Sequence, residues 1–270
     1  MITPSELESR FHALYASLSE AGNVLRAYHR NKQYSIKRKA DGSRVTSADI
    51  EMSDFWKELL HRLFPGEFIV SEEDENTHSF SDRPEIIWYV DPIDGTSKFI
   101  NGSPYYYVLI SMCVNGLPVF GIMYQPEKEE TLFGCTNLKT RLYNAKGGFQ
   151  EIHPQNSWIQ EHPILVKGMD SGLRHTISSY TERPVKRSYT EKHHITQALS
   201  PGVCGFISYR PTAYWDLAAP AAIMHSAGYQ TGIIQGKQQA SYNSIPVRSD
   251  RFYCLPMDTP EHVISYISQM

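Results

Sequence analysis

The sequence predicts an α/β fold in which helices alternate with short strands along the 270 residues. Apolar residues repeat at spacings of three and four from residue 7 to residue 28, which is typical of an amphipathic helix. Two runs rich in β-branched and aromatic residues flank Asn115-Gly116, a dipeptide that strongly favours a hairpin turn. A helix of small residues is indicated after Asp216. Helices and strands are therefore expected along the whole length of the sequence.

Two helices are expected at the N-terminus. Residues 3–6 (TPSE) form a capping box with proline at the first helical position, so a helix of about seven turns should begin there. Its buried face should consist of Leu7, Phe11, Leu14, Leu18, Ala21, Leu25 and Tyr28. A second helix should begin near Thr46 and end before Pro65-Gly66. Its buried face should consist of Met52, Phe55, Leu59 and Leu63.

Strands are expected next, at residues 68–71, 86–90, 106–114, 117–124, 131–135 and 141–143. The stretch 147–158 is interpreted as a connection. Between residues 164 and 210 we expect a strand, a helix around residues 191–199 and another strand. Asp216 is placed where an N-cap is expected, ahead of a helix over residues 217–227. Strands near 229–234 and at 251–255 and a last helix capped by residues 259–261 complete the expectation.

Composition excludes several classes of protein. The formal net charge of -3 gives no support to a nucleic-acid-binding surface. No apolar run is long enough to span a membrane, and the N-terminus lacks the basic start and apolar middle of a signal peptide. The four cysteines are scattered without a Cys-x-x-Cys pair, which favours reduced thiols in a cytoplasmic protein.

Residues 91–96 (DPIDGT) are the most informative segment. The apolar strand 86–90 leads directly into two carboxylates three residues apart, a pattern that suits a hard divalent cation such as Mg²⁺. The backbone N–H groups of Gly95-Thr96 suit a phosphate. Metal and phosphate side by side indicate metal-assisted phosphoryl chemistry. The alternative is an ordinary turn, because Asp-Pro and Asp-Gly are common turn dipeptides.

Two other segments bear on this choice. Residues 71–75 (SEEDE) follow the short apolar run 68–70 and, taken alone, are typical of a solvated acidic loop. They could nevertheless bring Glu72 beside Asp91 if the two strands are neighbours. The third segment is 214–220 (YWDLAAP), in which Asp216 alone would be only a helix cap.

Together these segments resemble the inositol monophosphatase superfamily of Mg²⁺-dependent, lithium-sensitive phosphatases. The resemblance rests on four segments in order: 39–49 (KADGSRVTSAD), 71–74 (SEED), 91–99 (DPIDGTSKF) and 215–219 (WDLAA), the last followed by Ala227-Gly228. It implies a layered α/β/α/β/α sandwich of the type shared with fructose-1,6-bisphosphatase. Residues 1–150 would form an N-terminal α+β half with an antiparallel sheet and most metal ligands. Residues 151–270 would form a C-terminal α/β half with substrate contacts and Asp216.

The resemblance also implies roles for particular residues. The first Mg²⁺ would be held by Glu72, Asp91 and the Ile93 carbonyl, and the second by Asp91, Asp94 and Asp216. Two or three ions are expected in total. The Thr96 hydroxyl, with Glu72 or Asp49, would orient and deprotonate the attacking water. The substrate would be bound by Asp94, Gly95, Thr96, Lys98 and Asp216. For Glu73 both a catalytic role and a solvated or supporting role stay open.

The expected substrate is a small phosphate ester. Segments 71–74, 39–43 and 95–100 look like the branch that hydrolyses 3′-phosphoadenosine 5′-phosphate, and Lys98 replaces the Asn usual in inositol phosphatases. Two alternatives remain: an inositol- or sugar-phosphate phosphatase with the same metal site, and a non-catalytic metal- or phosphate-binding protein. Relatives are often monomers or homodimers.

The substrate-contacting region differs from the family pattern, because residues 201–210 are compressed ahead of the Trp-Asp motif. Candidate contacts for an additional phosphate are Lys186, Arg187, His193, His194 and Arg210. The run Tyr105, Tyr106 and Tyr107 is expected to form strand and core rather than a base-stacking platform.

Overall fold

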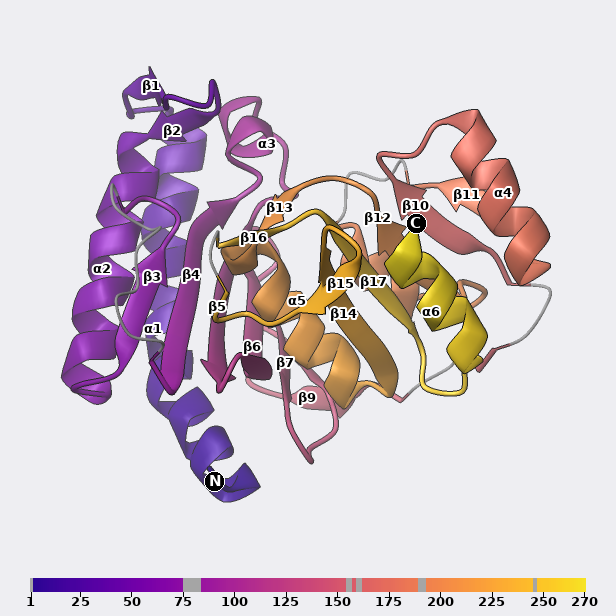
Figure 1. The fold of residues 1–270 in the computed structure, drawn as a ribbon. Helices are drawn as coiled ribbons and strands as arrows, with labels where there is room; N and C mark the ends of the chain where they lie inside the picture. The colour runs from indigo at the N-terminus through magenta and orange to yellow at the C-terminus, as the bar shows by residue number, and fades with distance from the viewer. Residues whose placement is uncertain (1, 75–83, 154–156, 159–161, 189–192, 245–246) are drawn as a thin grey trace.

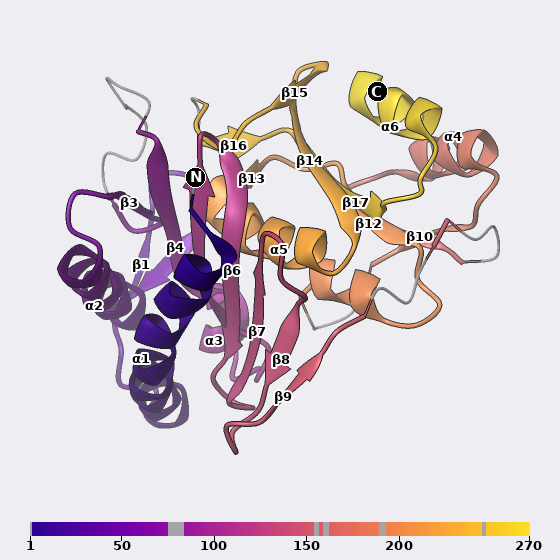
Figure 2. The same cartoon turned by 90° about the horizontal axis from the view of Figure 1, so that it is seen from below.

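The structure, a computed structural model, describes residues 2–74, 84–153, 157–158, 162–188, 193–244 and 247–270. These residues form five layers (Figures 1 and 2). Helices α1 (Pro4–Asn31) and α2 (Ser47–Leu63) cover one face of a seven-stranded sheet. Helix α5 (Tyr214–Ser226) separates that sheet from a six-stranded one. Helices α4 (Ser171–Thr181) and α6 (Glu261–Gln269) cover the far side. The α/β/α/β/α sandwich is therefore confirmed.

Both N-terminal helices begin with a capping box. In α1 the Thr3 side chain accepts a hydrogen bond from the backbone N–H of Glu6, and the Glu6 carboxylate accepts one from the N–H of Thr3. In α2 the same exchange joins Thr46 and Asp49. Each box satisfies backbone donors that a helix start would otherwise leave without partners. The box at α2 also fixes the position of the Asp49 carboxylate.

The seven-stranded sheet has its strands in chain order: β3 (Phe68–Ser71), β4 (Ile86–Asp94), β5 (Tyr107–Val114), β6 (Leu117–Gln125), β7 (Glu130–Cys135), β8 (Arg141–Tyr143) and β9 (Phe149–Glu151). Strands β3 and β4 pair in parallel, and the other neighbours pair antiparallel. Strand β9 falls within the expected connection 147–158, so that prediction is wrong in part. All three β9 residues are exposed, so no buried alternation marks the strand in the sequence.

The six-stranded sheet has the order β11 (Val185–Arg187), β10 (Ile164–Lys167), β12 (Gly205–Ser208), β17 (Arg251–Pro256), β14 (Tyr229–Gln235) and β15 (Gln238–Ala240). Two short pairs complete the described strands: β1 (Ile36–Arg38) with β2 (Arg44–Thr46), and β13 (Thr212–Ala213) with β16 (Arg248–Ser249).

Three expectations for the C-terminal half are wrong. Helix α4 was not expected; it buries only Ile177 and Thr181, although its N-cap Asp170 accepts the N–H of Leu173 and offered a local signal. The helix expected at 191–199 is, within the described residues, a 3₁₀ turn at Ile195–Leu199; residues 191–192 lie outside them. The last helix begins at Glu261 with Pro260 as N-cap and no side-chain capping bond, so no capping by Thr259 is present.

Helix α5 lies directly on the seven-stranded sheet. A Cβ atom at Gly121 of β6 would stand 2.3 Å from the carbonyl oxygen of Ala219, and one at Gly134 of β7 would stand 2.6 Å from the Cα of Ile223. The absence of a side chain at both positions lets the helix backbone approach the strands. This approach brings the first turn of α5 to the end of β4.

Gly121→Ala should therefore lower the free energy of unfolding by about 1–3 kcal/mol, the usual cost of overpacking a filled core. Urea denaturation of the purified protein measures this change. Gly148→Ala is the control, because its Cβ would meet no atom closer than 3.6 Å and its stability should change by less than about 0.5 kcal/mol. Equal stability of the two variants would contradict the packing of α5 on β6.

Candidate active site

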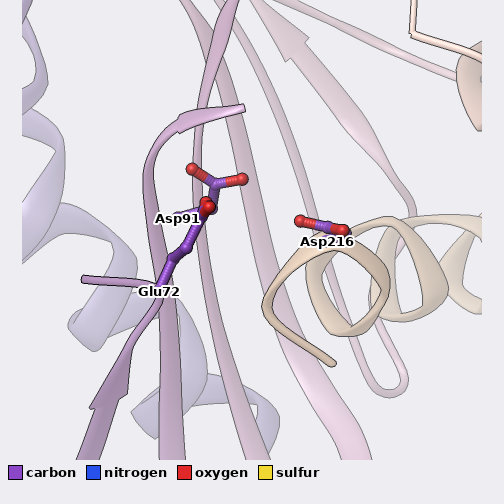
Figure 3. Close-up of side chains that lie close together, drawn as sticks. All are labelled: Glu72, Asp91 and Asp216. Carbon is purple, nitrogen blue, oxygen red and sulfur yellow. The ribbon is translucent and has the colours of Figure 1, made fainter. Parts of the chain in front are cut away.

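Three carboxylates from three different elements meet where β3 and β4 end. Because the two strands are parallel, their carboxyl ends lie at the same edge, with Ser71 opposite Val90. The N–H of Glu72 donates to the carbonyl of Val90 at 3.0 Å, so Glu72 follows β3 beside Asp91. Asp216 reaches the same place from α5 (Figure 3). One oxygen from each carboxylate lies within 4.8 Å of the other two.

The sequence suggested that Asp216 is an N-cap, and this prediction is wrong. Helix α5 begins at Tyr214 with Ala213 as its N-cap, which places Asp216 inside the first turn. The carboxylate is thus presented from a regular helix and not from a loop. Its proximity to Glu72 and Asp91 links α5 to the ends of β3 and β4 (Figure 3).

This cluster is electrostatically unfavourable without a cation. Asp91 is only 1% exposed, and burial together with the negative charges of Glu72, Asp94 and Asp216 raises its pKa well above the usual range. Burial and the charges of Glu72 and Asp94 likewise raise the pKa of Asp216. Bringing buried carboxylates together disfavours their ionised forms unless positive charge compensates. Hard oxygen donors are the ligands that Mg²⁺ prefers, so the donor set fits this ion.

The last residues of β4, from Asp91 to Asp94, depart from regular pairing with β5. The N–H of Ile93 donates to Asp91 Oδ1 at 3.0 Å, and the register between β4 and β5 shifts between Asp91 and Asp94. Asp94 lies outside the cluster of three and lines a neighbouring cavity together with Asp216. Gly95 follows with φ 90°, in the left-handed region that glycine adopts without a steric penalty.

Thr96 and Asp49 form a hydrogen-bonded pair. The Thr96 hydroxyl lies 3.1 Å from Asp49 Oδ1 and 3.2 Å from the carbonyl oxygen of Ile93, so its one hydrogen can be donated to either. Asp49 is 1% exposed and accepts two further hydrogen bonds from Thr46. Burial raises the pKa of Asp49, while the bonds from Thr46 and Thr96 oppose this rise. The pair ties the start of α2 to the loop after β4.

Glu73 is held in an ion pair that the sequence did not reveal. The Lys39 ammonium lies 2.9 Å from Glu72 Oε1 and 2.8 Å from Glu73 Oε2. The Glu73 side chain is only 4% exposed, so the possibility that it is solvated is wrong. Burial raises the pKa of Glu73 to about 7, although Lys39 opposes the shift. The sequence signal was present in segment 39–49, whose first residue is this lysine.

Asp94 and Asp216 line a cavity of about 190 Å³ together with two lysines and two histidines. The lysines are Lys98 of α3 (Thr96–Ile100) and Lys167, which is the last residue of β10. The histidines are His193 and His194. Sequence reasoning missed Lys167, since a single lysine at a strand end carries no pattern. Burial and the charge of Lys167 lower the pKa of each histidine to about 3. His193 is therefore neutral at pH 7, and its 3.6 Å approach to Asp94 is not an ion pair.

The other candidate residues lie elsewhere. Lys186 and Arg187 are exposed on β11, and Arg210 is exposed after β12; none of the three lines the cavity, although the charge of Arg210 acts on Lys167. Tyr106 and Tyr107 are buried as expected for core residues.

Comparison with known proteins identifies the family. A sequence model described as the inositol monophosphatase family matches residues 6–254. The chain belongs to the inositol monophosphatase family. It is therefore a member of a family of phosphoric monoester hydrolases, as the sequence motifs predicted.

Individual relatives agree with this assignment. The chain is 28% identical over 225 residues to the 3′(2′),5′-bisphosphate nucleotidase CysQ of Aggregatibacter actinomycetemcomitans, covering 77% of this chain and 78% of that protein. It is 34% identical over 145 residues to the bifunctional phosphatase IMPL2 of Arabidopsis thaliana, covering 52% of this chain but only 41% of that protein. A solved IMPase/NADP phosphatase complexed with Mg²⁺ and phosphate shares the fold, with a TM-score of 0.74 at 16% identity over 97% of this chain and 95% of that one.

A membrane-spanning helix was not expected. Among the described residues, every helix is too short or too polar to cross a bilayer.

Proposed function

We propose that the protein is a Mg²⁺-dependent phosphatase whose substrate is a 3′(2′),5′-bisphosphate nucleotide, 3′-phosphoadenosine 5′-phosphate in particular. The observation that carries the proposal is the position of a three-carboxylate cluster beside a cavity lined by lysines. The cluster suits a divalent cation, and the lysines suit a substrate with more than one negative group.

The metal would be held by Glu72, Asp91, the Ile93 carbonyl, Asp94 and Asp216. When bound, it would lower the pKa of a water molecule and offset charge on the phosphoryl oxygens. Three of these five groups already lie together in the structure, and Asp94 lines the cavity next to them. We propose two or three ions.

The remaining chemistry falls to Thr96 and Asp49. While the Thr96 hydroxyl donates its hydrogen to Asp49, its oxygen lone pairs can accept a hydrogen bond from the attacking water. Asp49 is held by Thr46 and so keeps the hydroxyl oriented. Asp49 or Glu72 would receive the proton released by that water. Gly95 and Thr96 would contact the phosphate through their backbone N–H groups.

Inositol or sugar monophosphates are the second candidate substrates, because the proposed metal site would serve them equally. Two observations favour the nucleotide: the similarity to CysQ over most of the chain, and Lys98 and Lys167 in the cavity wall. A monophosphate would offer these lysines no second phosphate.

Phosphate release in the presence of Mg²⁺ tests the proposal. We expect kcat/KM for 3′-phosphoadenosine 5′-phosphate to exceed that for inositol 1-phosphate by about 100-fold, the effect of two well-formed charged contacts. A preference for inositol 1-phosphate would retain the metal chemistry and overturn the nucleotide assignment. Failure to hydrolyse either compound, or a third ester such as a sugar phosphate, would overturn both.

A further inference from the structure

The cavity beside the carboxylate cluster brings together cations from opposite halves of the molecule. Lys98 belongs to α3, which begins two residues after Asp94, the last residue of β4. Lys167 ends β10 in the second sheet, where its Cα partner on β12 is Ser208. Lys98, Lys167 and Ser208 all line the same cavity. With about 190 Å³ it has the volume of about six water molecules, which is room for more than one polar substituent.

Lys167 is placed at an electrostatic cost. Its side chain is half-buried, and no ion pair joins it to a carboxylate in the part of the chain that the structure describes. Burial lowers the pKa of Lys167; the charges of Asp94 and Asp216 oppose this shift, and those of Arg210 and Lys98 add to it. A partly buried ammonium among like charges is unfavourable unless an anion compensates it.

The carboxylates of Asp94 and Asp216 would not compensate the charge of Lys167 once a metal ion is bound. Both carboxylates belong to the proposed metal-binding set, so a divalent cation would use the negative charge that Lys167 now experiences. The cavity wall would then carry Lys98 and Lys167, with the charge of Arg210 nearby and the adjacent carboxylates already offset. A second phosphate on the substrate would supply a compensating anion.

We propose that Lys167 binds the second phosphate of a bisphosphate substrate, the one that is not hydrolysed. This contact would determine the preference for bisphosphates over monophosphates. The inference rests on the proposed phosphatase function and adds a specificity residue to it. Lys98, which lines the same cavity, contacts the same group. The neutral rings of His193 and His194 complete the wall without adding charge.

A matched pair of substrates tests the assignment: 3′-phosphoadenosine 5′-phosphate and adenosine 3′-monophosphate, which lacks only the second phosphate. In Lys167→Gln we expect KM for the bisphosphate to rise about 10- to 100-fold, the effect of losing one charge-assisted contact. KM for the monophosphate should stay within about twofold. Lys167→Arg retains the positive charge, so its KM for the bisphosphate should stay close to the wild-type value. Lys186→Gln, an exposed lysine of β11 outside the cavity, is the matched control and should change neither KM.

An equal change for both substrates in Lys167→Gln would overturn the inference, because it would show that Lys167 only balances Asp94 and Asp216. A second measurement does not depend on turnover. Calorimetry with Mg²⁺ should show adenosine 5′-monophosphate binding at least about 10-fold more weakly to Lys167→Gln than to the wild type. An unchanged affinity would also overturn the inference. If the wild type hydrolyses no phosphate ester, the proposed function fails, and this binding result still decides the role of Lys167.

Discussion

Asp91→Asn should abolish most phosphatase activity while stabilising the metal-free protein. We expect kcat to fall by more than about 100-fold, since even residues that only orient metal ligands typically account for 10- to 100-fold. Asp91 is the most buried member of the cluster, and Figure 3 shows it close to Glu72 and facing Asp216 of α5. Asn retains the shape and one oxygen but lacks the charge that a divalent ion requires.

The expected gain in stability follows from the sign of the pKa shift. Burial and neighbouring carboxylates raise the pKa of Asp91 in the folded state, so its ionised form is disfavoured there relative to the unfolded chain. The stability that the protonated form provides is complete below the unfolded pKa and is lost as pH rises through the folded one. At pH 7 the neutral Asn avoids this loss. The melting temperature of the variant in EDTA should therefore exceed that of the wild type.

In the presence of Mg²⁺ the wild type should have a higher melting temperature than Asp91→Asn, the reverse of the order in EDTA. A ligand at 100 times its Kd stabilises the folded state by about 2.7 kcal/mol, so Mg²⁺ should raise the melting temperature of the wild type by several degrees. The response of Asp91→Asn should be much smaller. Asp54→Asn, whose carboxylate is 62% exposed on α2, is the control and should behave as the wild type does. A lower melting temperature of Asp91→Asn in EDTA, combined with an intact Mg²⁺ response, would contradict the proposed site.

The sequence predicted those parts of the site that depend on short segments. Glu72 was expected beside Asp91 if two strands were neighbours, and β3 and β4 are parallel neighbours. The resemblance to a family placed Asp216 with them, although periodicity alone assigned it to a cap. The helix begins at Tyr214, three residues before the expected start at residue 217, and its N-cap is Ala213, which has no capping side chain. No local signal marks such a start.

What the sequence did not predict depends on contacts between distant segments. Lys39 reaches Glu73 across more than thirty residues, and Lys167 reaches the cavity only because β10 pairs with β12. The edge strand β9 and helix α4 bury too little apolar surface to produce a clear periodic pattern. These elements are specified by tertiary packing, which single-sequence periodicity does not report.

Thr96→Val should separate catalysis from metal binding. Valine has nearly the same shape as threonine but lacks the hydroxyl that lies 3.1 Å from Asp49. If this hydroxyl orients the attacking water, kcat should fall about 100- to 10,000-fold, the range for loss of a group that assists proton transfer. Thr96→Ser keeps the hydroxyl and should recover most of the rate.

The fold and the response to Mg²⁺ should survive this substitution. Asp49 retains two hydrogen bonds from Thr46, so losing the Thr96 hydroxyl should cost only about 1 kcal/mol of stability. Because Thr96 contributes no carboxylate to the cluster, Mg²⁺ should raise the melting temperature of Thr96→Val as much as that of the wild type. A kcat within about threefold of the wild type would remove Thr96 from the mechanism. A lost Mg²⁺ response would show instead that the substitution disturbs the loop after β4, and with it the carboxylates that the loop positions.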